Sequence, residues 1–233
     1  MPIVNHIFEP KRLYLVWHHS GDNSPRHRRI VGELYRDGES ASFRYLKQSD
    51  DYRLAVEEGF IGFPAFTVHS NEPFKNAIDV FSKRLPPQKR ADFGKYLSQY
   101  GLPDNFEGTT LALLGYTGAR LASDSFELCA DYSDMEAPAD LVLEVAGAQY
   151  YLSLNSLPVE GDRVDFKFEP HNVHDCNAIA IIWQDTKIGY ISKSVAPGLS
   201  TTIKTMQVNG FILKTSLRQE RIQVMVLAEC RKI

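Results

Sequence analysis

The stretch EPHNVHDCNAIAIIWQDTKIGYISKSVA, from Glu169 to Ala196, decides how the C-terminal part of this chain folds. It opens on a polar segment and continues into two short apolar runs, 178–183 and 187–192. Short runs rich in β-branched residues and bounded by turn-forming residues are typical of strands in a small barrel or sandwich. This stretch therefore predicts a β-rich fold around it.

The segments on either side extend the same pattern. Residues 194–206 can hold one helix, and the polar stretch 131–140 has no hydrophobic periodicity, so we place a domain boundary there. The sequence thus predicts a β-rich C-terminal domain at 140–233. Further short β-type runs of that domain occupy 141–147, 162–170 and 222–230.

Before the boundary, the sequence predicts a second domain at 1–132 that mixes strands and helices. Residues 30–46 are expected to form a hairpin, because Asp37-Gly38 is a preferred turn pair between two partly alternating runs. The spacing of apolar residues predicts helices within 72–87, 88–103 and 109–115, while 13–17 is expected to be a strand and 18–29 a loop. The chain is therefore expected to be α+β, with an N-terminal antiparallel sheet and helices followed by a small barrel.

Composition excludes several classes of protein. The 233 residues are 43% hydrophobic and 24% charged, which suits two ordinary globular domains. The chain has no run of 18 apolar residues and no apolar segment behind a basic start, so we expect neither a membrane span nor a secretory signal. Its three cysteines are far apart and odd in number, which favours a reducing compartment and a cytoplasmic location.

The net charge of −3 is unevenly distributed. Residues 140–186 contain two Lys or Arg against eight Asp or Glu, whereas 187–233 contain eight against two. A locally basic segment can bind polyanions even when the whole chain is mildly acidic. The alternative is that these charges form an ordinary solvated face.

The chemistry-bearing residues at 171–176 form neither a convincing metal site nor a catalytic centre. His171, His174, Asp175 and Cys176 are nearly consecutive and would point in different directions, and no second ligand pair completes a zinc site. A nucleophile such as Cys176 needs a base from another segment, which the pattern does not supply. The chain also lacks GxxxxGK[ST], GxGxxG, GxSxG and HExxH. We therefore expect no enzyme activity, no metal and no cofactor.

The C-terminal stretch resembles the HIRAN domain over about residues 140–230. The resemblance rests on Pro170, Asn172, His174, Asp175 and the Asn177-Ala178-Ile179 that follows, then on Ile188-Gly189-Tyr190 and Lys193. Upstream, VAGAQYY at 145–151 is similar to a strand of the family that ends in two tyrosines. The resemblance implies an OB-like β-barrel that, in fork-remodelling helicases, binds the free 3′ end of single-stranded DNA.

The resemblance also implies roles for individual residues. Asp175 matches an aspartate that contacts the terminal 3′-hydroxyl, and His174 matches an aromatic residue that stacks on a base. The DNA-binding residues implied by the match are Gln149, Tyr150, Tyr151, His174, Asp175, Tyr190 and Lys193. Gln149 replaces an arginine and His174 replaces a tyrosine, which weakens phosphate contact but leaves hydrogen bonding and stacking. Alternatively, Asp175 and Asn177 only hold their loop through side-chain to backbone hydrogen bonds.

Residues 11–130 loosely resemble the N-terminal subdomain of HipA-type kinases. The resemblance follows the order of IVGELYRDG, FRYL, GFPAF, SKRLPPQKR and LALLGYTGA. The catalytic core of those kinases is absent, so the resemblance implies a module that docks a partner, such as a HipA-type kinase or a helix-turn-helix protein.

Two hypotheses of function follow. In the first, the chain is a non-enzymatic adaptor whose C-terminal barrel binds single-stranded DNA or 3′ ends while the N-terminal domain docks a protein. In the second, both domains are protein-interaction modules of an antitoxin-like neutraliser, without DNA binding. An open, basic groove lined by aromatic residues around Tyr150 and His174 would favour DNA, and a filled or acidic one would favour the alternative.

Overall fold

The computed structural model describes residues 2–19, 27–218 and 221–233, and the residues form two compact units. One unit comprises Glu9–Gln88 and Gly108–Asp131. The other comprises the N-terminal residues up to Phe8, Lys89–Glu107 and Tyr132–Ile233. The chain passes between the units four times, and the last passage, from Asp131 to Tyr132, lies at the start of the predicted boundary. Residues 20–26 of the predicted loop at 18–29 lie outside the described part of the chain.

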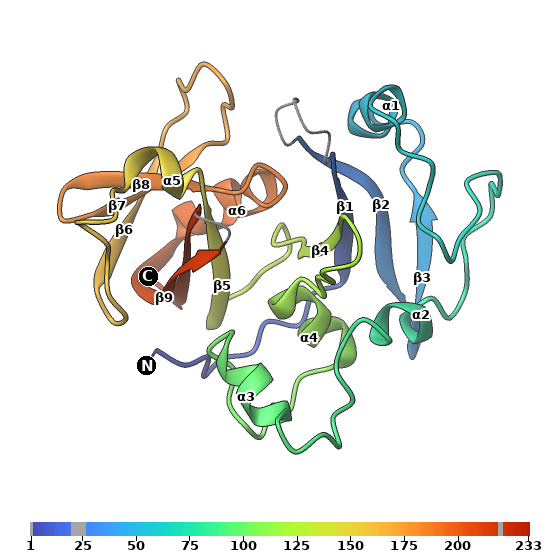
Figure 1. Cartoon of the computed structure of the whole chain (residues 1–233), viewed down its shortest axis with the longest axis horizontal. Coiled ribbons are helices and arrows are strands. Elements are labelled where there is room, and N and C mark those ends of the chain that lie inside the picture. The colour runs from blue at the N-terminus through green and yellow to red at the C-terminus, as the bar shows by residue number, and fades with distance from the viewer. Residues whose placement is uncertain (1, 20–26, 219–220) are drawn as a thin grey trace. The chain divides into compact units, whose positions relative to one another are not determined.

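The first unit is built on an antiparallel sheet with strand order β3-β2-β1-β4 (Figure 1). The strands are β1 (Arg12–His18), β2 (Arg28–Asp37), β3 (Ser40–Tyr45) and β4 (Phe126–Ala130). The predicted hairpin is confirmed, because β2 and β3 pair up to Asp37 and Ser40, with Gly38 at a φ of +64° in the turn. The prediction of an antiparallel N-terminal sheet with helices is also confirmed.

The helices of this unit differ in extent from those predicted. α4 (Thr110–Thr117) begins after the capping hydroxyl of Thr109 and ends at Gly118, which takes a left-handed conformation. α2 (Ile78–Ser82) is much shorter than the helix expected within 72–87. The reason is that the backbone of Phe74 exchanges two hydrogen bonds with Phe43 on β3, which covers the edge of the sheet instead of joining a helix.

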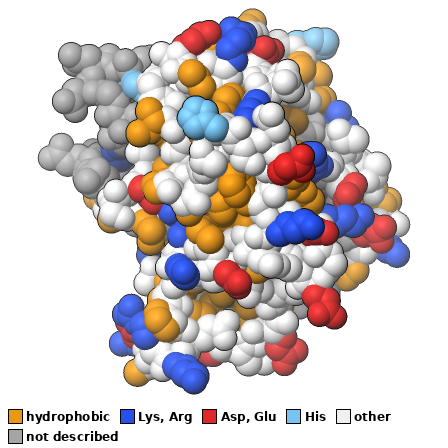
Figure 2. Space-filling model, turned by 90° about the vertical axis from the view of Figure 1, so that its right-hand side faces the viewer, with side chains coloured by type: hydrophobic (Ala, Val, Ile, Leu, Met, Phe, Trp, Pro, Cys, Tyr) orange, Lys and Arg blue, Asp and Glu red, His pale blue; other side chains and the backbone are white. Residues whose placement is uncertain are grey.

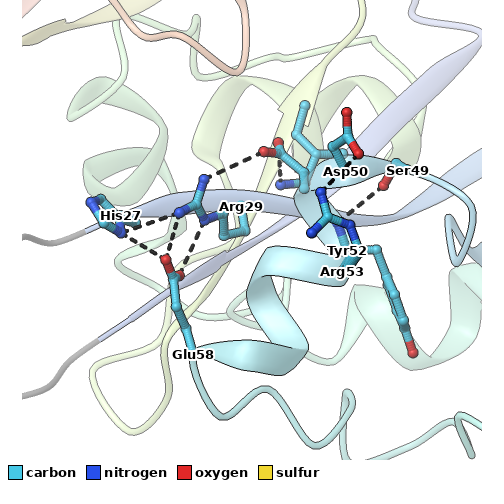
Figure 3. Close-up of polar contacts among 9 residues, drawn as sticks. His27, Arg29, Ser49, Asp50, Tyr52, Arg53 and Glu58 are labelled. Atoms are coloured by element: carbon cyan, nitrogen blue, oxygen red, sulfur yellow. Dashed lines mark hydrogen bonds and ion pairs between the residues drawn. The ribbon is translucent and has the colours of Figure 1, made fainter.

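A helix that the sequence pattern did not predict, α1 (Asp50–Glu57), is fastened to β2 by charged side chains (Figure 3). Arg29 on β2 donates from Nε to Glu58 at 3.1 Å, and His27 contacts the same carboxylate at 2.8 Å. These hydrogen bonds lower the pKa of Glu58 to about 2. At the other end of α1, the Ser49 hydroxyl accepts a hydrogen bond from the backbone of Tyr52.

The second unit contains a closed antiparallel barrel of six strands, ordered β10-β5-β8-β7-β6-β9 (Figure 1). The prediction of a small C-terminal barrel is therefore confirmed. Its strands are β5 (Ala139–Ala146), β6 (Arg163–Phe168), β7 (Ile179–Trp183), β8 (Thr186–Ile191), β9 (Met206–Arg218) and β10 (Arg221–Lys232), and its helical segments are α3 (Phe93–Ser98), α5 (Ala148–Tyr151), α6 (Ala196–Thr202) and the 3₁₀ turn η1 (Ile203–Thr205).

The barrel closes at two short seams, and a glycine lies at each. β6 meets β9 through two residue pairs, one of which is Val164 with Gly210, and a Cβ on Gly210 would lie 2.5 Å from the Val164 carbonyl oxygen. β5 likewise meets β8 through two pairs, and a Cβ on Gly189 would lie 2.5 Å from the Ala146 carbonyl oxygen. Only glycine allows the backbones to approach this closely.

The N-terminal residues are part of the barrel unit. The buried carboxylate of Asp140 on β5 accepts hydrogen bonds from the backbone nitrogens of Asn5 and His6, at 2.7 and 2.9 Å. Its other oxygen accepts one from Arg231 on β10 at 2.6 Å. A segment 134 residues distant in sequence is thus held against β5. Whether each predicted domain, 1–132 or 140–233, folds by itself stays a prediction.

One local prediction about the barrel unit was wrong, and another was confirmed with a shorter extent. Residues 145–151 were expected to be one strand, but β5 ends at Ala146 and Gly147 turns the chain, with a φ of +77°, into the helical turn α5. The helix expected within 88–103 is reduced to α3. No helix in the described part of the chain is both long enough and apolar enough to cross a lipid bilayer.

We predict that Gly210→Ala destabilises the barrel unit, because the added methyl group would overlap the Val164 carbonyl at the seam. Overpacking of this kind costs about 1–3 kcal/mol. Chemical denaturation monitored by circular dichroism measures the change. Gly38→Asn is the control, since no atom lies within 4 Å of the Cβ position of Gly38, and asparagine tolerates the positive φ of that turn residue. Equal stability of both variants would contradict the role of the seam.

Candidate functional site

The candidate site lies on the outer surface of the barrel where three segments meet beside the seam between β5 and β8. Tyr190 on β8 pairs with Ala146 on β5 and with Ala180 on β7. The helical turn α5 follows β5 directly, and the loop 169–178 leads from β6 into β7. The side chains of α5, of the loop and of Tyr190 are therefore brought together by strand pairing.

Two tyrosines on α5 are exposed. The side chain of Tyr150 is 81% exposed and that of Tyr151 is 42% exposed. The Tyr151 ring contacts the Tyr190 ring edge to face, with centroids 6.0 Å apart. The site therefore presents one nearly free aromatic ring beside a pair of rings that support one another.

A network of polar side chains surrounds the hydroxyl group of Tyr190. This hydroxyl donates to Oε2 of Glu169 at 3.0 Å and accepts from Lys187 Nζ at 2.5 Å. Lys187 also donates to Oε1 of Glu169 at 3.1 Å, and Asn172 Nδ2 donates to Oε2 at 3.0 Å. The Lys187 ammonium lies 4.6 Å from the centre of the Tyr190 ring and 5.8 Å from that of Tyr151, within the range of cation–π attraction.

The network fixes the charges of its members. Hydrogen bonds from Asn172, Lys187 and Tyr190 lower the pKa of Glu169, with the bond from Asn172 as the largest cause. The hydrogen bond with Tyr190 and the neighbouring Glu169 raise the pKa of Lys187. Both groups are therefore charged near neutral pH, and they form a partly exposed ion pair within the site.

The loop 169–178 is held by its own side chains. Oδ1 of Asp175 accepts a hydrogen bond from the backbone nitrogen of Asn177 at 2.8 Å, and Asn172 Oδ1 accepts one from the backbone nitrogen of His174 at 3.0 Å. Asn177 is in turn bonded to Ser200 on α6. These bonds leave the His174 side chain exposed. Asp175 thus has the loop-holding hydrogen bond that was the alternative to a ligand contact, and this bond uses one of its two oxygens.

The structure places the remaining predicted residues on neighbouring segments. Gln149 lies on α5 beside Tyr150, and Lys193 is exposed in the link between β8 and α6, flanked by the buried Ser192 and Ser194. Tyr151 and Tyr190 are in direct contact. That the seven residues together form a DNA-binding site stays a prediction.

Sequence reasoning missed Glu169 and Lys187, which are central to the network. Both residues belong to the stretch that carries the family resemblance, but they are 18 positions apart. No spacing pattern relates them, because the loop and the β7–β8 hairpin bring them together.

Within 2–19, 27–218 and 221–233, no three His, Cys, Asp or Glu side chains are grouped as metal ligands. The side chains of the 171–176 segment instead make the loop contacts given above or face solvent.

Residues 139–227 match the family model of the HIRAN domain, the segment over which the sequence resembles that family. Among solved structures, the chain is similar to the HIRAN domain of human HLTF, with 20% identity over 39% of this chain and 74% of that one and a TM-score of 0.33. It is also similar to a protein from Lactobacillus plantarum, with 26% identity over 39% and 97% and a TM-score of 0.30. No curated protein matches the chain.

We predict that Asp175→Ala lowers stability, whereas Asp175→Asn does not. The asparagine amide retains the oxygen that accepts from the Asn177 nitrogen, while alanine leaves that nitrogen without its partner. A hydrogen bond of this kind contributes about 0.5–1.5 kcal/mol. Thermal unfolding of the two variants beside wild type measures the difference. An unchanged melting temperature for Asp175→Ala would show that the bond does not hold the loop.

Proposed function

We propose that the barrel unit binds single-stranded DNA through the outer surface formed by α5, β8 and the loop 169–178. The observation that carries the proposal is the exposure of Tyr150 and Tyr151 beside the Lys187 ammonium. Proteins that bind single strands combine aromatic rings, on which bases stack, with cations that contact the phosphate backbone. The match of this segment to the HIRAN family supports the same proposal.

The shape of the loop supports binding of an end. His174 is exposed near the tip of the loop, and the adjacent Val173 is 90% exposed. Asp175 uses Oδ1 to hold the turn, so its Oδ2 can accept a hydrogen bond from a ligand. A terminal 3′-hydroxyl is a donor of the required kind, because carboxylates accept but do not donate when ionised. We therefore propose that the 3′ end is bound beside Asp175.

We further propose that the chain is an adaptor without catalytic activity, in which the first unit docks a protein. In support, Val56 on α1 and Ile61 in the following loop are 50% and 91% exposed. Figure 2 shows one face of the molecule on which hydrophobic side chains lie between charged ones. These side chains do not specify the partner, because single exposed apolar residues are common on monomers. The kind of partner, including a HipA-type kinase, stays a prediction.

We predict that Tyr150→Ala weakens binding to single strands of any sequence. Stacking of a base on an aromatic ring contributes about 1–3 kcal/mol, which corresponds to about a fivefold to hundredfold loss of affinity. Fluorescence anisotropy with labelled oligonucleotides of two unrelated sequences measures it. Ile61→Ala is the control, because it removes an exposed apolar side chain from the other unit and should leave affinity unchanged.

The outcome against the proposal would be equal affinity for Tyr150→Ala and wild type. Affinity of wild type that does not fall as salt rises would also count against it. Each phosphate neutralised on a single strand gives a log–log slope of about −0.7.

We predict that Asp175→Asn erases the preference for a free 3′ end while the loop stays folded. Wild type and variant are compared on oligonucleotides with a 3′-hydroxyl or a 3′-phosphate. A hydrogen bond to a charged group contributes about 1.5–3 kcal/mol, or about a tenfold to hundredfold preference. If Asp175→Asn prefers the free end as strongly as wild type does, the carboxylate does not bind the hydroxyl group.

A further inference from the structure

We infer that Glu169 is a built-in competitor of phosphate, which holds Lys187 in an ion pair and thereby limits how tightly the site binds the nucleic-acid backbone. The inference rests on the proposed function, because it concerns the affinity of the same surface. It assigns to Glu169 a role opposite to that of the binding residues, since removing its charge should strengthen binding.

The geometry shows that the carboxylate occupies the place of an anionic ligand. Its two oxygens receive hydrogen bonds from Lys187 Nζ, Asn172 Nδ2 and the Tyr190 hydroxyl, at 3.0–3.1 Å. An ammonium, an amide and a hydroxyl are also the donors with which proteins contact phosphate. The carboxylate accepts one hydrogen bond from each of these donors, so a phosphate oxygen can take these three bonds only by displacing it.

The position of the pair relative to the tyrosines makes the competition relevant. The Lys187 ammonium lies beside both the Tyr190 and Tyr151 rings, at 4.6 and 5.8 Å from their centres. A base stacked near Tyr151 therefore brings its phosphate close to this ammonium. The pair is not buried, since the side chains of Lys187 and Glu169 are 31% and 25% exposed, so a ligand can reach both groups.

The charges give the direction of the effect. Lys187 and Glu169 together carry no net charge, so an approaching phosphate meets attraction and repulsion of similar size. Exchanging the carboxylate for an amide leaves a net charge of +1 beside the tyrosines. The ammonium can then release a counterion from the strand, which steepens the salt dependence of binding.

The test measures affinity for a single-stranded oligonucleotide in wild type, Glu169→Gln, Lys187→Gln and the double variant. Glu169→Gln should bind about threefold to fivefold more tightly, because an exposed ion pair contributes up to about 1 kcal/mol. Its log–log salt slope should be steeper by about 0.7. The gain should vanish in the double variant, because Lys187 mediates it.

Two controls separate competition from other causes. Asp165→Asn removes an exposed carboxylate from β6 of the same barrel, and it should leave affinity near that of wild type. An oligonucleotide with an uncharged methylphosphonate backbone should bind equally to wild type and Glu169→Gln. Thermal unfolding of each variant shows that the fold is kept.

The outcomes distinguish this inference from the proposed function. If wild type binds single strands but Glu169→Gln binds no more tightly, the inference is overturned and the proposed function stands. A gain of the same size in Asp165→Asn also overturns it, because net charge alone would then explain the effect. If neither wild type nor Glu169→Gln binds single strands, the proposed function and the inference about Glu169 are both overturned. If Glu169→Gln binds and wild type does not, the result supports competition between Glu169 and phosphate for Lys187.

Discussion

Closure of the six-stranded barrel is the constraint on which the site depends. A closed barrel leaves no strand edge to pair with another chain, so what the barrel binds must contact side chains or loops. Closure is achieved by two seams of two residue pairs each, between β6 and β9 and between β5 and β8. At both seams glycine is required, because the backbones approach too closely for any Cβ.

The β5–β8 seam also creates the candidate site. Because Ala146 pairs with Tyr190, the chain that leaves β5 must turn away at Gly147, and the turn becomes α5. The two tyrosines of α5 consequently lie over β8, where Tyr151 contacts Tyr190. The same geometry that closes the barrel thus exposes an aromatic surface on its outside, and a rigid scaffold positions it.

The ion pair between Lys187 and Glu169 gives this aromatic surface its electrostatic character. In the proposed function, stacking on Tyr150 would be insensitive to charge, whereas contact with a nucleic-acid backbone would depend on the charge that remains after Lys187 has paired with Glu169. The basic composition of 187–233 therefore overstates the positive charge available to a ligand at this site. Formal charge counted along a sequence does not show which cations already have a partner.

The sequence by itself determined the α+β class, the N-terminal hairpin and the C-terminal barrel, because alternating apolar runs and the Asp37-Gly38 turn are local signals. The resemblance to the HIRAN domain implied Tyr151 and Tyr190 as residues of one binding site, which stays a prediction. Only the tertiary structure decided that Tyr150 lies on a helical turn, that the residues up to Phe8 are held by Asp140, and that Glu169 neutralises Lys187. Each of these depends on contacts between residues far apart in the chain, which strand pairing creates and no local pattern records.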